Sequence, residues 1–537
     1  MSEAHSGPDP SAVVLSTGGD AAVLGRLPFG ARDSASGRRA RVRFAGWAVG
    51  AIGLLALLVI LLGVCVVVLY ASAGSHALVP RGRSFPSWEA GPLHWVLSQP
   101  IWPRMRVVRR YSELLGVLTC AYAVAMLAGR RLPLKLIAAF AVVSAAILLV
   151  GPPLPLNDVG DYLGYARLAG RHGLNPYTHV IFAERHDPVY QIATWRNLSS
   201  PYGPLFTILT IPLAWLPLAT AYWVLKVAIV GLSLGFLWLV ARVAVHLDRD
   251  PRLPVLFVAA NPIYLFYEVG GFHNDFLMLV PSMAAILLLI TRRDRAAGAV
   301  LMLAVAVKFT TIVLLPFLLV AAGSRDRRLR VLIGSALAAV PLAAISFSLF
   351  GAALPNLADQ SRLVTGFSIP NLAGLVLGFG GSTTALMRAA DVGVVLVVLW
   401  GVRRDDWLAS AGWATLALIA SLAWLMPWYI VWALPLAALA SSRTLRVAVL
   451  AFSVFLIATF LPLTGQFMRE HHFNPLSSGV DRAAAAFARD LERPPGSGRR
   501  RIVLCQNPAR CSVCLRSEAP PPWSATTPIR SCRQLVS

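Results

Sequence analysis

The chain has 537 residues, of which 57% are hydrophobic and only 14% are charged. A mean hydropathy of +0.66 excludes an ordinary soluble protein and indicates a polytopic membrane protein. The formal net charge is +23, but the basic residues lie between apolar runs and in the two tails. This distribution is typical of a topology signal, so we expect membrane lipids as partners and no nucleic acid.

The first 43 residues are rich in Gly, Ala and Ser, and we expect residues 1–43 to form a disordered cytoplasmic tail. The apolar run that follows, Phe44 to Ala71, is too long and begins too late to be a cleaved signal peptide. It should therefore stay as a membrane anchor. The basic residues that hold the tail inside are Arg38, Arg39, Arg41 and Arg43.

The next two apolar runs carry the chain in and out again. A span near residues 113–129 returns it to the cytoplasm, where Arg130, Arg131 and Lys135 lie. A third span, at residues 133–151, then points outward. This topology places Asp158 and Asp161 in an outer loop of about residues 152–203, on the extracytoplasmic side.

Two later segments do not read as ordinary spans. Residues 204–218 are short and contain three prolines, so we expect a half-inserted or interfacial piece. Residues 297–323 have basic clusters at both ends and Lys308 near the middle. This pattern favours two short helices that enter the membrane and return, with Lys308 at the outer turn.

The remaining apolar runs complete an all-α fold. Further spans are expected near residues 329–350, 384–402, 407–424, 427–441 and 445–465. With the earlier runs they predict about 12 to 13 transmembrane helices between residues 44 and 466. This count leaves the C-terminal tail, residues 467–537, outside, although it is rich in arginine. Either the last crossing is miscounted, or the tail is exempt from the usual charge bias.

The same tail is polar, and we expect it to be disordered apart from a short surface helix after Asp481. It contains one Cys-x-x-Cys motif, which invites a zinc interpretation. A second pair and a nearby histidine are missing, so the zinc signal is weak. The cysteines concerned are Cys505, Cys511, Cys514 and Cys532.

Polar residues that interrupt apolar sequence fall mostly on one face of the predicted bundle. A charge at the centre of a membrane helix costs about 2.5 to 3.5 kcal/mol, and less near the interface, so such residues need partners. A shared outer pocket would supply them. The polar positions are Asp158, Asp161, the segment Glu268 to Asp275, Lys308, and the segment Met426 to Trp432.

Each of these features has a structural alternative. The two aspartates are three residues apart and could only cap a helix. The sequence Gly173 to Tyr177 is typical of a turn that ends that helix. A helix cap explains Asn274 or Asp275, but not the neighbouring histidine. Lys308 could snorkel or bind an anion, and the aromatic residues Trp424, Trp428, Tyr429 and Trp432 could form an interfacial belt or stack on sugars.

Several motifs in a fixed order resemble those of a known superfamily. They are Asp-Val before a tyrosine, Gly-Leu-Asn-Pro-Tyr, Trp195-Arg196, Ser-Pro-Tyr-Gly-Pro-Leu at 200–205, Asn261-Pro262, Gly-Phe-His-Asn-Asp at 271–275, Lys308 and Pro-Trp-Tyr at 427–429. Over about residues 110–465 the chain resembles the GT-C membrane glycosyltransferases, especially the actinobacterial polyprenol-phosphomannose-dependent alpha-mannosyltransferases and glycosyltransferase family 87. The resemblance implies a lipid-phosphate sugar donor and a catalytic acid in the first large outer loop, here Asp158 or Asp161.

Sugar transfer from such a donor needs one carboxylate as general base and one cation for the departing phosphate. We favour Asp158 as the base, with Asp161 binding the acceptor or capping the helix. Lys308 would stabilise the phosphate, with His273 or Arg196 as weaker candidates, and Asp275 could orient His273 or hold the acceptor. The full set of predicted substrate-binding residues is His273, Asn274, Asp275, Lys308, Arg196, Tyr202, Trp428 and Tyr429. No metal signature occurs in the membrane part, and the need for a divalent metal stays open.

The working hypothesis is an inverting glycosyltransferase in the plasma membrane. It would move a sugar, most simply mannose, from a polyprenyl-phosphate donor to a cell-envelope glycan or glycolipid on the extracytoplasmic face. One rival is a secondary transporter, because Lys226, Arg388 and Asp391 lie inside apolar runs. A noncatalytic scaffold is the third hypothesis. It predicts that both aspartates tolerate replacement by asparagine.

Overall fold

The structure is a computed structural model that describes residues 33–75, 78–79, 85–97, 99, 101–156, 158–353 and 355–492. The cysteine-containing end of the chain and residues 1–32 lie outside this range, as does Asn157. Two units are distinguished. The first, up to Val49, contributes only the start of helix α1, and the second, from Gly50 on, contains everything that follows.

Within the described residues the fold is built from helices and contains no strand, which confirms the predicted all-α class. Six helices are long and apolar enough to cross a membrane, namely Trp47–Ser72, Arg104–Arg131, Leu218–His246, Arg325–Phe350, Thr384–Gly401 and Arg443–Phe460. Six further apolar segments are shorter: Leu134–Val150, Pro204–Trp215, Phe276–Ile290, Phe309–Ala322, Trp407–Ser421 and Pro427–Leu439. The protein is therefore polytopic, while the full count of crossings stays a prediction.

The helices follow one another with short connections. The first half contains α1 (Asp33–Ser72), α2 (Ser87–Ala90), η1 (Pro92–Trp95), α3 (Arg104–Ala128), η2 (Gly129–Arg131), α4 (Leu134–Val150), α5 (Val159–Gly170), η3 (Ile181–Glu184), η4 (Pro188–Gln191), α6 (Pro204–Thr210), η5 (Ile211–Trp215), α7 (Leu218–His246), α8 (Arg252–Ala259) and the π-helix η6 (Tyr264–Val269). The second half contains α9 (Phe276–Ile290), α10 (Asp294–Val307), η7 (Phe309–Leu314), α11 (Leu315–Ala322), α12 (Arg325–Phe350), α13 (Leu357–Ser361), α14 (Ile369–Val376), α15 (Thr384–Gly401), α16 (Trp407–Ser421), η8 (Pro427–Trp432), α17 (Leu434–Leu439), α18 (Arg443–Phe460), α19 (Pro462–Glu470) and α20 (Gly479–Glu492).

Helices extend across two of the predicted domain boundaries. Helix α1 begins at Asp33, inside the segment 1–43 that was expected to be a disordered tail. At the other end, α19 and α20 occupy residues 462–492, so the polar sequence after residue 467 is helical up to Glu492. Helix α20 confirms the short helix predicted after Asp481. It folds because its alanine-rich sequence has a strong helix propensity and because one of its faces is buried.

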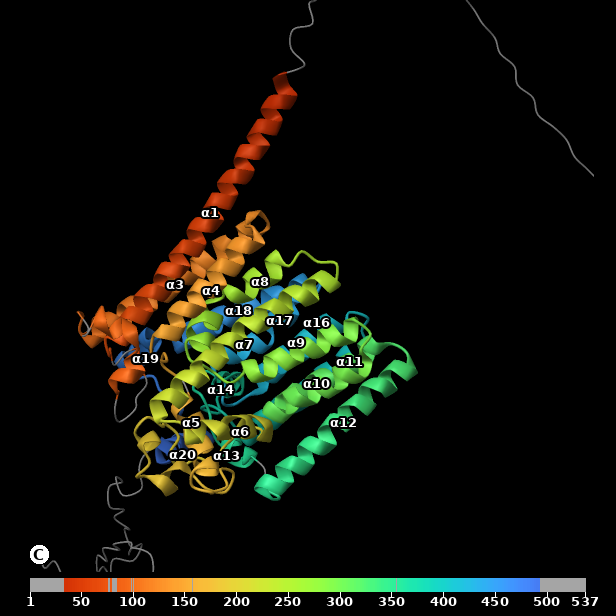
Figure 1. Cartoon of the computed structure of the whole chain (residues 1–537). Coiled ribbons are helices and arrows are strands. Elements are labelled where there is room, and N and C mark those ends of the chain that lie inside the picture. The colour runs from red at the N-terminus through yellow and green to blue at the C-terminus, as the bar shows by residue number, and fades with distance from the viewer. Residues whose placement is uncertain are drawn as a thin grey trace, which may run out of the picture. The chain divides into compact units, whose positions relative to one another are not determined.

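On one side of the bundle, neighbouring antiparallel helices pack very closely. Helices α9, α10 and α12 lie side by side (Figure 1). A Cβ atom added at Gly298 of α10 would lie 2.0 Å from the carbonyl oxygen of Val331 in α12. One added at Gly334 of α12 would lie 1.9 Å from the carbonyl oxygen of Arg295. Only glycine permits these two backbones to approach so closely.

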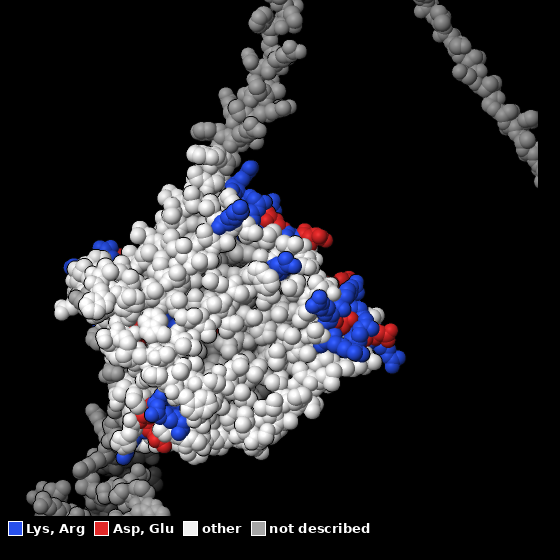
Figure 2. Space-filling model, viewed as in Figure 1, with Lys and Arg blue, Asp and Glu red and all other residues white. Residues whose placement is uncertain are grey.

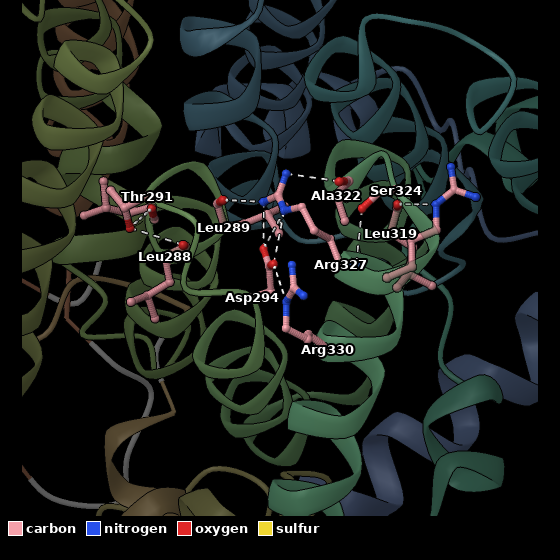
Figure 3. A network of polar contacts seen from close by, with 11 residues as sticks. Leu288, Leu289, Thr291, Asp294, Leu319, Ala322, Ser324, Arg327 and Arg330 are labelled. Carbon is pink, nitrogen blue, oxygen red and sulfur yellow. Dashed lines mark hydrogen bonds and ion pairs between the residues drawn. The ribbon is translucent and has the colours of Figure 1, made fainter.

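A charged network joins the turns at one end of these helices (Figure 3). Asp294, the first residue of α10, accepts hydrogen bonds from Arg327 at 2.7 Å and Arg330 at 3.1 Å. Arg327 also donates to the carbonyl oxygens of Leu289 and Ala322, both at 3.0 Å. One guanidinium thus joins the ends of α9 and α11 to the starts of α10 and α12. Figure 2 shows basic side chains gathered at this margin, beside a broad uncharged surface.

The predicted break at Lys308 is present. Helix α10 ends at Val307 because Lys308 adopts an extended conformation with φ −149° and ψ 112°, and η7 begins at the next residue. The amide of Gly203 donates to the freed carbonyl oxygen of Val307 at 3.0 Å. A Cβ atom at Gly203 would lie 2.2 Å from the carbonyl oxygen of Ala306, so this contact requires glycine. It brings the Ser-Pro-Tyr-Gly-Pro-Leu motif against Lys308.

Candidate active site

A cavity of about 1170 Å³ lies among segments that are far apart in the sequence. Small-molecule pockets usually have volumes of roughly 300 to 1,000 Å³, so this cavity has room for more than one substrate. Eight of the ten predicted site residues line it, namely Asp158, Arg196, Tyr202, Asn274, Asp275, Lys308, Trp428 and Tyr429. The other two, Asp161 and His273, are buried and contribute nothing to the cavity wall.

Asp158 stands immediately before α5 with its side chain 21% exposed. Its Oδ2 atom accepts a hydrogen bond of 3.0 Å from the Tyr202 hydroxyl and lies 4.0 Å from Nδ1 of His273. Burial raises the pKa of Asp158 to about 6, although the Tyr202 hydrogen bond and the charge of Lys308 work in the opposite direction. A carboxylate with this pKa is mostly ionised at neutral pH and can still accept a proton.

The backbone around Asp158 is constrained on both sides. Leu156 has a φ of 64°, in the left-handed region that non-glycine residues rarely adopt. On the other side, a Cβ atom at Gly160 would lie 2.4 Å from the carbonyl oxygen of Ile192, so α5 packs directly on that backbone. The Asp158 side chain makes no capping hydrogen bond to α5, which argues against capping as its role. Strained positions of this kind are common at functional sites.

Asp161 serves the loop rather than the cavity. Its Oδ1 atom accepts hydrogen bonds from the backbone amides of Thr194, at 3.0 Å, and Trp195, at 2.8 Å. The side chain is 1% exposed, and burial together with the nearby charge of Asp158 raises its pKa well above the usual value. Asp161 therefore neither caps α5 nor reaches an acceptor in the cavity. It anchors residues 194–195, which carry the predicted Trp-Arg motif.

Lys308 and Asp275 form an ion pair at the cavity wall. The Lys308 ammonium donates to Oδ1 of Asp275 at 2.7 Å, and the Trp432 indole donates to the same oxygen at 2.5 Å. Asp275 is buried, whereas the Lys308 side chain remains 20% exposed. The ammonium also lies 5.3 Å from the centre of the Tyr429 ring and 4.9 Å from that of Trp432. Because an ammonium carries three N–H donors, Lys308 can still donate into the cavity.

His273 is held in a buried stack. Its ring lies 3.7 Å from that of Trp428, with an angle of 15° between the planes. Burial lowers the pKa of His273 to about 3, so the imidazole is neutral. A neutral ring adds no positive charge for a phosphate, which argues against His273 as an anion clamp. The preceding residue, Phe272, has a φ of 52°, so this turn is strained as well.

The remaining predicted cation, Arg196, is committed to the loop around it. Its Nε donates to the carbonyl oxygen of Tyr190 at 3.0 Å, and its Nη1 donates to that of Glu492 at 3.2 Å. The guanidinium also lies 5.0 Å from the centre of the Tyr190 ring. These contacts favour a role for Arg196 in building the wall of the cavity.

Helix α20 docks on this same loop. The amide of Asn197 donates to the carbonyl oxygen of Leu491 at 3.0 Å, and its side chain donates to that of Asp490 at 2.8 Å. Leu491 packs in a small apolar cluster with Leu198 and Leu363. In Figure 1 helices α5, α6, α13 and α20 gather at one end of the bundle. Helix α20 therefore packs against the loop of residues 152–203 that carries Asp158.

Sequence reasoning missed three contributors to the site. The sequence indicates an interfacial belt or sugar stacking for Trp432, whereas its indole is a direct hydrogen-bond partner of Asp275. The Tyr162 hydroxyl accepts a hydrogen bond of 3.1 Å from the backbone amide of Asn274 and so ties α5 to the His-Asn-Asp turn. The helix α20 itself was predicted, but its docking on the loop at Asn197 was not, because a polar, alanine-rich segment gives no sign of its docking partner. For Trp432, its place beside a buried aspartate cannot be read from local sequence either.

Among the described residues, no group of three or more His, Cys, Asp or Glu side chains is placed to hold a metal ion. Two carboxylates on the cavity wall have different partners, since Asp275 is paired with Lys308 and Asp158 with Tyr202.

Comparison with known proteins gives consistent matches over most of the folded chain. Residues 51–324 match the family model of the alpha-(1->6)-mannopyranosyltransferase N-terminal domain, and residues 365–488 match that of the MptB C-terminal domain. The chain is 28% identical to alpha-(1->6)-mannopyranosyltransferase A of Mycobacterium tuberculosis over 358 residues, which are 60% of this chain and 68% of that protein. The corresponding enzyme of Corynebacterium glutamicum is 30% identical over 177 residues, 32% of this chain and 35% of the relative. No solved structure matches.

Proposed function

The chain belongs to the alpha-(1->6)-mannopyranosyltransferase family and is a membrane mannosyltransferase, and we propose that it uses Asp158 to transfer mannose with inversion from a polyprenyl-phosphate donor. The GT-C resemblance of its motifs agrees with this family. Membership in a family of transferases also argues against the transporter hypothesis. Of the three charges that prompted it, Lys226 is fully buried and donates to the carbonyl oxygen of Gly151, which is a structural role.

The observation that carries the mechanism is the pairing of one proton acceptor with one cation on the wall of a single cavity. Asp158 would take the proton of the acceptor hydroxyl as that oxygen attacks C1 of the donor sugar. The bond between C1 and the phosphate oxygen would break on the opposite side, so the anomeric configuration inverts. The lipid phosphate leaves with the electron pair, and Lys308 donates hydrogen bonds to its developing charge.

The surroundings of these two groups support their roles. The Tyr202 hydroxyl orients the Asp158 carboxylate, and Asp275 with Trp432 fixes the Lys308 ammonium. Trp428 and Tyr429 present aromatic surfaces on the cavity wall, where sugars commonly stack. We place the cavity on the extracytoplasmic face of the plasma membrane, because the charge pattern of the flanking helices puts the loop of residues 152–203 there. The acceptor would be a cell-envelope glycan or glycolipid.

The test is transfer from radiolabelled polyprenyl-phosphate-mannose in membranes that contain the protein. We expect Asp158→Asn to lower kcat by about a hundredfold to ten-thousandfold, the usual contribution of a general base. Asp326→Asn, in the exposed first turn of α12, is the matched control and should retain full activity. Full activity of the Asp158→Asn variant would refute the assignment of the base. Retention of the donor's anomeric configuration in the product would refute the single displacement.

A further inference from the structure

Helix α15 carries two charges that the proposed mechanism does not use. Of its 18 residues, Arg388 and Asp391 are the only ionisable ones, and they lie in an otherwise apolar sequence. The helix is one of the candidate membrane spans, and only 6% of its apolar window is buried inside the protein. Most of α15 therefore faces outward, as expected of a helix in contact with lipid.

One face of α15 nevertheless turns to the cavity. The residues of this helix that line the cavity are Thr384, Met387, Arg388 and Asp391. Their spacing of three, four and seven residues places them on a single helical stripe. The same cavity is lined by Asp158 and Lys308, so the stripe on α15 and the proposed catalytic pair belong to one continuous space.

The two charges are unsatisfied by the protein itself. Within the described residues neither Arg388 nor Asp391 makes a hydrogen bond or an ion pair with another side chain, and both side chains are exposed. A charge within a membrane helix costs about 2.5 to 3.5 kcal/mol on insertion scales, and such residues mark ligand sites by default. Snorkelling to the headgroup layer would explain an arginine near a helix end, but not the aspartate one turn deeper on the cavity face.

The chemistry of the pair indicates its ligand. A guanidinium binds phosphate oxygens through two parallel hydrogen bonds, and a carboxylate accepts hydrogen bonds from sugar hydroxyls. We propose that Arg388 and Asp391 form a second binding site, on the lipid-facing wall of the cavity, for a lipid-borne phosphate that carries a sugar. Arg388 holds the phosphate, Asp391 accepts hydrogen bonds from hydroxyl groups, and the apolar outer face of α15 borders the lipid chain.

This site rests on the proposed function, and it assigns a place in the cavity to one of the two lipid substrates. The phosphate belongs either to the polyprenyl-phosphate donor or to the phospholipid anchor of a glycolipid acceptor. Both present the same group to Arg388. Kinetics with each substrate varied in turn distinguish them.

The first experiment uses the full chain in lipid nanodiscs. Arg388→Gln should raise KM for one of the two lipid substrates by about tenfold, which corresponds to about 1.4 kcal/mol, with kcat nearly unchanged. Arg388→Lys, which keeps the charge but not the paired geometry, should give an intermediate KM. Arg403→Gln, an exposed arginine just beyond the other end of α15, is the control. A higher KM for the donor places the donor at this site, and a higher KM for the acceptor places the acceptor there. KM values equal to those of the control for both substrates overturn the proposal.

The second experiment does not require transfer activity, so it separates this inference from the proposed function. A polyprenyl phosphate without sugar and a phospholipid, each bearing a photoreactive diazirine, are crosslinked to the protein in parallel. We expect one of these probes to label α15, and Arg388→Gln, but not Arg403→Gln, to reduce that labelling. Equal labelling of the unmodified protein and Arg388→Gln, or no labelling of α15 by either probe, refutes the site even where transfer itself is normal.

Discussion

Removal of the Tyr202 hydroxyl should shift the pH dependence of transfer to higher pH. The hydroxyl donates to Asp158 at 3.0 Å and thereby stabilises the charged carboxylate and lowers its pKa. A hydrogen bond to a charged group is worth about 1.5 to 3 kcal/mol, and each pKa unit corresponds to about 1.36 kcal/mol. Because the Asp158 side chain is 21% exposed, water can replace part of this bond, so we expect a shift of about one unit.

The sign follows from the role of Asp158 as a base. Transfer requires the ionised carboxylate, so kcat/KM is full above the pKa and falls as the pH drops through it. For the unmodified protein this decline should be centred near the Asp158 pKa of about 6. For Tyr202→Phe it should be centred near pH 7, so that the variant is about fivefold slower at pH 6 and nearly equal at pH 8.5.

The measurement is kcat/KM for radiolabelled mannose transfer from pH 5 to pH 9 in vesicles. Tyr165→Phe is the matched control, because the Tyr165 hydroxyl donates to the carbonyl oxygen of Leu198 and not to Asp158. Its profile should keep the midpoint of the unmodified protein. A Tyr202→Phe profile with an unchanged midpoint, or with a midpoint at lower pH, would refute the reasoning. So would an equal loss of rate at every pH, since that would mean that Tyr202 contacts the substrate.

Three further outcomes are expected. Asp161→Ala should lower the unfolding midpoint in a thermal melt because it leaves two backbone amides unpaired, at about 1 to 3 kcal/mol each, whereas Asp161→Asn should keep most of the activity. If Asp161→Asn is as inactive as Asp158→Asn, the separation of their roles fails. Lys308→Met should destabilise the protein by roughly 3 kcal/mol because Asp275 is left as a buried charge, and the added change Asp275→Asn should restore the melt but not the transfer rate. Restoration of the rate would contradict the phosphate role of Lys308. A chain that ends at Ser478 should lose activity and melt at a lower temperature, while one that ends at Glu492 should behave as the full chain. Equal activity of the two truncated chains would show that α20 is dispensable.

The sequence was sufficient for the fold class and for the break at Lys308, because both follow from hydropathy and charge. An apolar run with a lysine at its centre cannot remain a continuous lipid-exposed helix without large cost, and the chain breaks at that residue. The grouping of most candidate residues on one cavity also followed, since topology alone placed their segments at the same end. Each of these inferences follows from the cost of placing polar or charged groups in the apolar interior of a membrane.

The sequence could not assign different roles to residues of the same type that lie close together in the chain. Asp158 and Asp161 are three positions apart and equally polar, yet one faces the cavity and the other holds residues 194–195. That difference arises from the way α5 packs on the backbone at Ile192, a tertiary contact without a local signal. The docking of α20 on Asn197 was unpredictable for the same reason, because it is made largely through backbone carbonyl groups that every sequence possesses.

The contact between α20 and the loop at Asn197 also constrains the number of membrane crossings between them. Both segments are polar, and we expect their contact to lie outside the bilayer, which predicts an even number of membrane crossings between Asn197 and Asp490. A topology with an odd number of crossings in that interval would conflict with this contact, whatever the hydropathy of the individual helices. Reporter tags inserted in an exposed turn of the loop and directly after Glu492 must therefore respond alike to a membrane-impermeant reagent, and the arginine-rich sequence that follows starts from the side of the membrane on which Asp158 lies.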